Sequence, residues 1–148
     1  MSFVKDLKEG QAAEDKFIEL LKEEYLFTHF FKPSGKFKFF DIIAVSNKGK
    51  VITYEVKKDR RSEETGNVAI ELEYNKHCSG VTTSTAKYVV YYLAGEDKFY
   101  SIETWKLRKF LWIHEDKKTF KTMNAGDGYK SKIMLIPVEE FKKIFTKL

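Results

Sequence analysis

The feature that most constrains this chain is a pair of strand-forming segments joined by a short turn, with one acid in each segment. Residues 39–45 and 51–56 are rich in β-branched and aromatic residues, which favour strands. Between them, residues 46–50 are typical of a turn, in which Gly49 can adopt the left-handed backbone that closes a three-residue loop. The pattern therefore predicts a β-hairpin folded about Lys48.

The register of this hairpin decides which side chains share a face. Folding about Lys48 places Asp41 opposite Glu55, so that the two carboxylates project from the same face. Lys57 joins that face because strand side chains alternate with a period of two. We expect the other face to join the core through a set of mostly apolar side chains: Phe40, Ile42, Ala44, Ile52, Tyr54 and Val56.

The opposed acids need an explanation, because two like charges facing each other destabilise a strand pair. A bound divalent cation turns the repulsion into attraction, and carboxylate oxygens suit Mg²⁺ or Mn²⁺. The alternative is a solvent-facing sheet edge, on which the acids are partly compensated by Lys38, Lys57 or Lys58. The hairpin taken alone leaves both interpretations open.

The whole chain has the length and composition of one folded domain. Its 148 residues, of which 43% are hydrophobic, predict a packed core over residues 1–148 and exclude a disordered chain. Cys78 is the only cysteine, so an internal disulfide is excluded and a reducing, cytoplasmic setting is expected. No apolar run approaches the roughly 20 residues that span a bilayer, and no signal-peptide pattern is present, so we expect no membrane contact.

The net charge of +5 favours polyanionic partners such as nucleic acid. One basic group flanks the paired acids: Lys36, Lys38, Lys58, Arg60 and Arg61. We expect these side chains to contact backbone phosphates, which give salt-sensitive affinity with little sequence information. A second basic region lies between residues 117 and 132, and a solvated surface explains it as well as a ligand site does.

The rest of the pattern predicts an α/β fold. Hydrophobic spacing indicates a helix over residues 2–25, although Gly10 weakens its middle and favours a start near Gln11. Further strands are expected at residues 27–32, 68–74, 88–93, 99–102 and 133–136. A helix capped by Thr104 is expected to run to about Trp112, and a last helix to begin at Pro137. With residues 60–67 and 114–132 as loops, this order predicts a mixed central β-sheet flanked by helices.

The Asp41…Glu55-Val56-Lys57 pattern on adjacent strands resembles the motif of the PD-(D/E)XK nuclease superfamily, which has the restriction-endonuclease-like fold. Small phage-type and Holliday-junction-resolvase-like members are the most similar. Phe40 stands where a proline may precede the acid in the motif, at a position that makes no metal contact. Many members take another acid from the preceding helix, and Glu14 in Gly10-x-x-x-Glu14 resembles it. Asp15 is the competing neighbour.

This resemblance, over roughly residues 10–93, implies a Mg²⁺-dependent endonuclease acting on DNA. Asp41, Glu55 and the backbone carbonyl of Val56 would hold the ion, and Lys57 would orient or deprotonate the attacking water. Glu14 would position a second metal or a metal-bound water. Branched or junction DNA is the implied substrate, and a homodimer would allow symmetric cleavage of both strands. The alternative is a non-catalytic nucleic-acid-binding module with a nuclease-like fold.

Glu71 is a further acid in the resembling region. It would either support the site or, more simply, pair with a basic neighbour.

Overall fold

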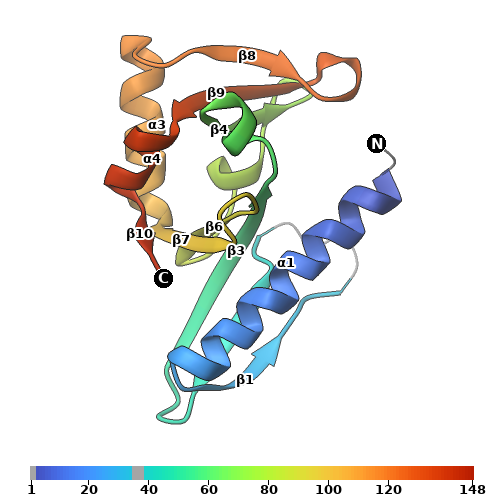
Figure 1. The fold of residues 1–148 in the computed structure, drawn as a ribbon, viewed down its shortest axis with the longest axis vertical. Coiled ribbons are helices and arrows are strands. Elements are labelled where there is room, and N and C mark those ends of the chain that lie inside the picture. The colour runs from blue at the N-terminus through green and yellow to red at the C-terminus, as the bar shows by residue number, and fades with distance from the viewer. Residues whose placement is uncertain (1–2, 35–38) are drawn as a thin grey trace.

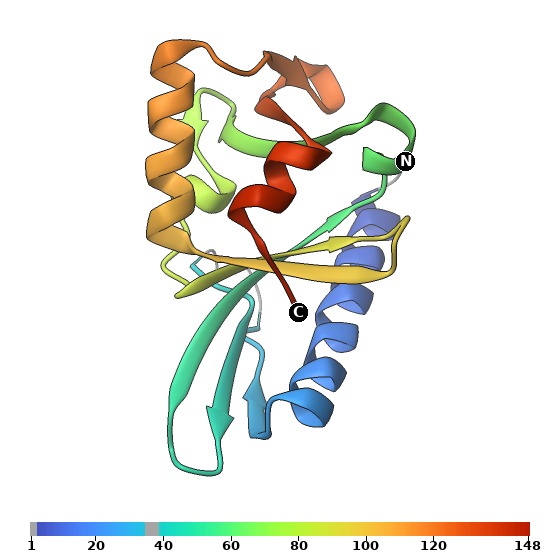
Figure 2. The same cartoon turned by 60° about the vertical axis from the view of Figure 1, so that its left-hand side comes forward.

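The computed structural model describes residues 3–34 and 39–148, which form two β-sheets with helices packed around them (Figures 1 and 2). The strands are β1 (Phe27–Phe31), β2 (Ile42–Ser46), β3 (Val51–Asp59), β4 (Asn67–Tyr74), β5 (His77–Cys78), β6 (Tyr88–Leu93), β7 (Lys98–Glu103), β8 (Thr122–Ala125), β9 (Ser131–Pro137) and β10 (Thr146–Lys147). The helices are α1 (Phe3–Glu24), α2 (Ser62–Thr65), α3 (Thr104–Lys117) and α4 (Val138–Ile144), with 3₁₀ turns η1 (Gly80–Thr82) and η2 (Asp127–Tyr129).

The larger sheet is mixed, as the sequence predicts. Its strand order is β1-β2-β3-β6-β7-β10, in which β3 and β6 run parallel and the other neighbours run antiparallel. The smaller sheet is antiparallel, with the order β5-β4-β9-β8. The sequence does not predict this second sheet. The smaller sheet lies over one end of the larger sheet, and the β2–β3 hairpin extends beyond the region that the smaller sheet covers (Figure 2).

The hairpin forms as its sequence predicts. Ile42 pairs with Tyr54 and Ala44 with Ile52, and this register places Asp41 opposite Glu55. Gly49 has the positive φ of 79° that the tight loop requires. Of the side chains expected on the core face, Ile42, Ala44, Tyr54 and Val56 are buried there and Ile52 is partly buried against them. Phe40 is partly buried.

Helix α1 covers this core face of the larger sheet (Figure 1). Ala13, Phe17 and Leu21 lie three or four residues apart, so they form one apolar stripe, and all three are buried. The Phe17 ring meets the Tyr54 ring edge-on, with 5.0 Å between centroids. The hairpin is thereby fixed against the helix that precedes it.

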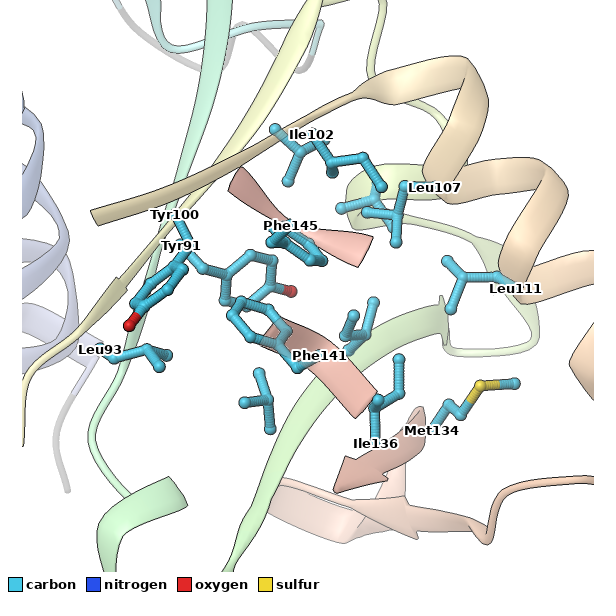
Figure 3. Close-up of a cluster of buried hydrophobic side chains, with 14 of the residues drawn as sticks. Tyr91, Leu93, Tyr100, Ile102, Leu107, Leu111, Met134, Ile136, Phe141 and Phe145 are labelled. Atoms are coloured by element: carbon cyan, nitrogen blue, oxygen red, sulfur yellow. The ribbon is translucent and has the colours of Figure 1, made fainter. Parts of the chain in front are cut away.

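The opposite face of the larger sheet packs against the smaller sheet, α3 and α4. Figure 3 shows the side chains that fill this space, with Tyr91 and Tyr100 from the larger sheet and Phe141 from α4 at its centre. The Phe141 ring contacts both tyrosine rings edge-on, with centroids 5.7 Å away in each case. This core holds the smaller sheet beside the end of the hairpin that carries Asp41 and Glu55.

The expected helix boundaries are wrong at two places. Helix α1 runs through Gly10 without a break. The cost of a helical glycine is only about 1 kcal/mol, and burial of the Phe17 and Leu21 side chains offsets it. Thr104 does not cap α3 but lies inside its first turn, where it is buried; Glu103 is the N-cap residue. Helix α3 continues to Lys117, beyond the predicted end near Trp112.

The two predicted loops also contain regular structure. Residues 60–67 include the short helix α2, and residues 114–132 include the last turn of α3 and the edge strand β8. The residues of β8 are mostly exposed, so the segment lacks the alternating pattern of a half-buried strand. Its pairing with β9 is what makes it a strand, and that contact is not visible in its own sequence.

Candidate active site

Asp41, Glu55 and Lys57 meet at the wall of a cleft with a volume of about 740 Å³. The backbone N–H of Asp41 donates to the Tyr54 carbonyl at 2.9 Å, which continues the hairpin pairing up to Asp41. The Oδ2 atom of Asp41 accepts a 2.8 Å hydrogen bond from the Val56 N–H. The Nζ atom of Lys57 lies 3.1 Å from Oε1 of Glu55. The hairpin therefore supplies two carboxylates and one ammonium to a single site.

The two carboxyl groups are placed where full ionisation is unfavourable. Burial raises the pKa of Asp41, while the Val56 N–H and the Lys57 charge act in the opposite direction. Burial also raises the pKa of Glu55, whose side chain is only 9% exposed; Lys57 acts against this and Asp41 adds to it. Neither acid is fully compensated by its neighbours, so a further positive charge at this point would be stabilising.

Lys57 carries the opposite charge in the same cleft. Burial acts to lower its pKa, but the Glu55 carboxylate and its hydrogen bond, with Asp41 and Glu71, outweigh burial and raise it. The side chain is therefore an ammonium at neutral pH. In this state it can donate hydrogen bonds and oppose negative charge, but it cannot accept a proton.

Helix α1 contributes Glu14 to the electrostatics of the site. Burial, followed by the nearby Asp41 carboxylate, raises the pKa of Glu14 from 4.5 to about 7, although Lys32 acts to lower it. Asp15 faces elsewhere: its side chain is 70% exposed and forms an ion pair with Lys32 at 2.5 Å. Of the two neighbouring acids on this helix, Glu14 is thus the one whose pKa is raised by the charges of Asp41 and Glu55.

The donor set fits Mg²⁺ or Mn²⁺ better than Zn²⁺. Within residues 3–34 and 39–148, no group of three or more His, Cys, Asp or Glu side chains is arranged to hold a metal, so a structural zinc site is not formed there. Magnesium is commonly bound by one or two carboxylates, with waters and substrate phosphate completing its octahedron. The Asp41–Glu55 pair supplies two carboxylates of the kind that such a site uses.

The second sheet supplies the opposite wall of the cleft, which the sequence does not reveal. Glu71 of β4 lines the cleft together with Glu55 and Lys57. Its carboxylate accepts hydrogen bonds from the hydroxyls of Ser79, at 2.9 Å, and Ser131, at 3.1 Å. Among residues 3–34 and 39–148, Glu71 forms no ion pair with a basic neighbour, contrary to the simpler expectation: two serines hold its carboxylate, and its charge raises the pKa of Lys57.

A buried serine, Ser84, contacts both chain segments of the hairpin site. The Ser84 hydroxyl contacts the Phe39 carbonyl at 3.0 Å and Oε2 of Glu55 at 3.4 Å. The guanidinium of Arg108 in α3 donates to the carbonyls of Val81 and Ser84, and so holds the loop that carries this serine. Sequence reasoning missed both Ser84 and Arg108, because nothing near either residue indicates that it contacts the hairpin.

Of the basic residues expected to bind phosphate, the three that the structure describes are spread around the site rather than gathered in it. Lys36 and Lys38 lie outside the described residues. Lys58 alternates with Lys57 on β3 and therefore belongs to the opposite sheet face. Arg60 forms an ion pair with Glu9 of α1. Arg61 is exposed beyond the end of β3.

Comparison with solved structures identifies a nuclease of similar fold. The bacterial homing endonuclease I-Ssp6803I superposes with a TM-score of 0.53 over 92% of this chain and 79% of its own, at 18% sequence identity. The two chains share a fold. No protein-family model matches the sequence, and no curated protein matches it either. The fold likeness thus supports the nuclease-like α/β architecture, in which the mixed sheet is flanked by helices.

Among the described residues, no helix combines the length and the apolar character needed to cross a membrane.

Proposed function

We propose that this protein is a metal-dependent endonuclease that hydrolyses DNA phosphodiester bonds, with a PD-(D/E)XK-type site. One observation carries the proposal: Asp41, Glu55 and Lys57 meet in one cleft, with Asp41 fixed by the Val56 N–H at 2.8 Å and Lys57 paired with Glu55 at 3.1 Å. The fold shared with a homing endonuclease supports it. The whole chain is proposed to act as one nuclease-like domain.

The proposed roles follow from the charges of the site. Asp41 and Glu55, with the backbone carbonyl of Val56, would hold Mg²⁺ or Mn²⁺. A divalent cation in such a site polarises the scissile phosphate and lowers the pKa of a bound water towards neutrality. Lys57, protonated at neutral pH, orients the attacking water and opposes the negative charge that develops on the phosphate. Glu14 is not among the residues that line the cleft, but its pKa responds to the Asp41 charge, and it would help to position a second metal or a metal-bound water.

The basic residues beside the site are proposed to bind the DNA backbone. Lys58, Arg60 and Arg61, together with Lys36 and Lys38, would contact phosphates along the bound DNA. Each contact adds salt-sensitive affinity without reading sequence. Branched or junction DNA is the proposed substrate, and a homodimer would place two such sites on opposite strands.

A cleavage panel tests this proposal. The purified protein is incubated with plasmid, single-stranded, flap and four-way-junction DNA, in Mg²⁺ or Mn²⁺ and in EDTA. Cleavage is expected only with metal. Asp41→Asn keeps the shape of the side chain but removes its charge, and is expected to lower the rate at least about 100-fold. Asp15→Asn is the matched control, because it removes an exposed carboxylate from the helix next to Glu14.

Metal binding has a separate readout in thermal unfolding. A cation that binds the folded protein stabilises it by about 2.7 kcal/mol at a concentration 100 times its Kd. Mg²⁺ is therefore expected to raise the Tm of the wild-type protein but not that of Asp41→Asn. A wild-type protein that binds DNA yet cuts none of the substrates would instead be a non-catalytic nucleic-acid-binding module.

A further inference from the structure

Two aromatic side chains stand at the walls of the same cleft. Phe39 and Tyr74 are each 51% exposed, and both line the space that contains Asp41, Glu55 and Lys57. Phe39 precedes Asp41 by two residues on the hairpin side, whereas Tyr74 ends β4 of the second sheet. The cleft is thus lined by one aromatic residue just before β2 and one at the end of β4, together with the two carboxylates and the ammonium.

Both rings are carried by fixed backbone. The Phe39 carbonyl accepts hydrogen bonds from the Ser84 hydroxyl at 3.0 Å and from the Thr85 N–H at 2.8 Å. Tyr74 is paired with His77 on one side and Ser131 on the other, so its strand position is held from both neighbours. Rigidly mounted aromatic rings bind at low entropic cost, because little freedom is lost when a ligand stacks on them.

The cleft also offers polar groups suited to the edge of a nucleobase. Asn75, His77 and Ser79 line it beside Tyr74. An amide, an imidazole and a hydroxyl can each donate or accept a hydrogen bond, so they accommodate the mixed donors and acceptors of a base edge. A volume of about 740 Å³ lies in the range of pockets that enclose small organic ligands.

We propose that Phe39 and Tyr74 form a stacking site for an unpaired nucleobase next to the scissile phosphate. A base inside a duplex has both faces covered by its neighbours, so a side-chain ring can stack only on a base that is single-stranded, at a branch point or extruded. This inference rests on the proposed nuclease function and adds a substrate class to it. The substrate is DNA with unpaired nucleotides at the cut, rather than continuous duplex.

The test compares binding of two labelled DNAs by fluorescence anisotropy in EDTA, so that no cleavage occurs. One is a plain duplex, and the other carries a single-stranded flap of about ten nucleotides. Base stacking on one aromatic side chain contributes a factor of about 5 to 150 in affinity. Phe39→Ala and Tyr74→Ala are each expected to raise the Kd for the flap by such a factor and to leave the Kd for the duplex nearly unchanged.

Conservative variants separate stacking from loss of structure. Tyr74→Phe keeps the ring and should bind the flap as the wild-type protein does, whereas Phe39→Leu keeps apolar bulk without an aromatic face and should bind more weakly. Trp112→Ala is the control, because it removes a ring that is 75% exposed on α3 and does not line the cleft. The Tm of every variant shows that it is folded.

The outcomes distinguish this inference from the proposed activity. Equal losses on both DNAs, no loss on either, or a Tyr74→Phe variant as weak as Tyr74→Ala would overturn the stacking site while metal-dependent cleavage still stood. A ring-dependent preference for the flap in a protein that never cleaves would keep the stacking site and refute the nuclease. Failure of the wild-type protein to bind either DNA would overturn both.

Discussion

Replacing Glu14 by glutamine should change how the stability of the protein depends on pH. The pKa of Glu14 is raised from 4.5 to about 7, first by burial and then by the Asp41 carboxylate. A carboxyl group whose pKa is higher in the folded state stabilises the fold fully below about pH 4.5, and this contribution is lost as the pH rises through about 7. Glutamine cannot ionise and has nearly the same shape, so Glu14→Gln removes that loss.

The magnitude follows from the size of the pKa change. Each pKa unit corresponds to about 1.4 kcal/mol, so a rise from 4.5 to about 7 corresponds to about 3.5 kcal/mol. Because solvent reaches part of the side chain, we reduce this to about 2 kcal/mol. In EDTA, Glu14→Gln should match the wild-type protein at about pH 4 and exceed its stability by about 2 kcal/mol at about pH 8. This difference is a rise in Tm of about 4–8 °C.

Urea unfolding at the two pH values, followed by circular dichroism, measures this difference. Glu19→Gln is the control, since it removes a carboxylate from the same helix at a side chain that is 63% exposed and paired with Lys22. A Glu14→Gln variant that gains nothing at about pH 8, or that differs equally from the wild-type protein at both pH values, would refute the reasoning. Glu14 would then not lie in the buried, negatively charged surroundings of Asp41.

Two further predictions concern the hairpin. Lys57→Ala should slow cleavage more than it weakens DNA binding, because the Lys57 ammonium opposes the negative charge that develops on the phosphate. Comparable losses in single-turnover rate and in DNA affinity would count against this role. Lys58→Ala is the control: Lys58 lies on the other sheet face, so this variant should weaken DNA binding alone. Ser84→Ala should lower the free energy of unfolding by about 1–3 kcal/mol, because it removes a hydroxyl donor that faces both the Phe39 carbonyl and the Glu55 carboxylate. Urea denaturation measures this change, and an unaltered midpoint would show that the serine does not support the hairpin.

The hairpin was predictable because its information is local. A turn with a left-handed Gly49 sets the register, and alternation then determines the face of every side chain in the two strands. The placement of Asp41 opposite Glu55, with Lys57 on the same face, follows from about fifteen consecutive residues. The apolar face that packs on α1 follows from the same alternation.

Which of Glu14 and Asp15 lies near Asp41 depends on how α1 packs against the larger sheet. One residue along a helix turns the side chain by about 100°, and an error of that size exchanges the two acids. The packing of Phe17 and Leu21 against the larger sheet fixes the rotation of α1, and with it the residue that faces Asp41. No pattern within the helix decides this.

The sequence by itself determined the β2–β3 hairpin and the shared face of Asp41, Glu55 and Lys57, because strand alternation and turn geometry act over only a few residues. The tertiary structure alone decided which residues from other elements lie beside the hairpin. Glu71 and Tyr74 reach the cleft because the second sheet packs over the end of the first, and Ser84 contacts Glu55 from a loop whose carbonyls accept hydrogen bonds from Arg108. These contacts join residues far apart in the chain through the shared core, and core packing is a property of the whole fold.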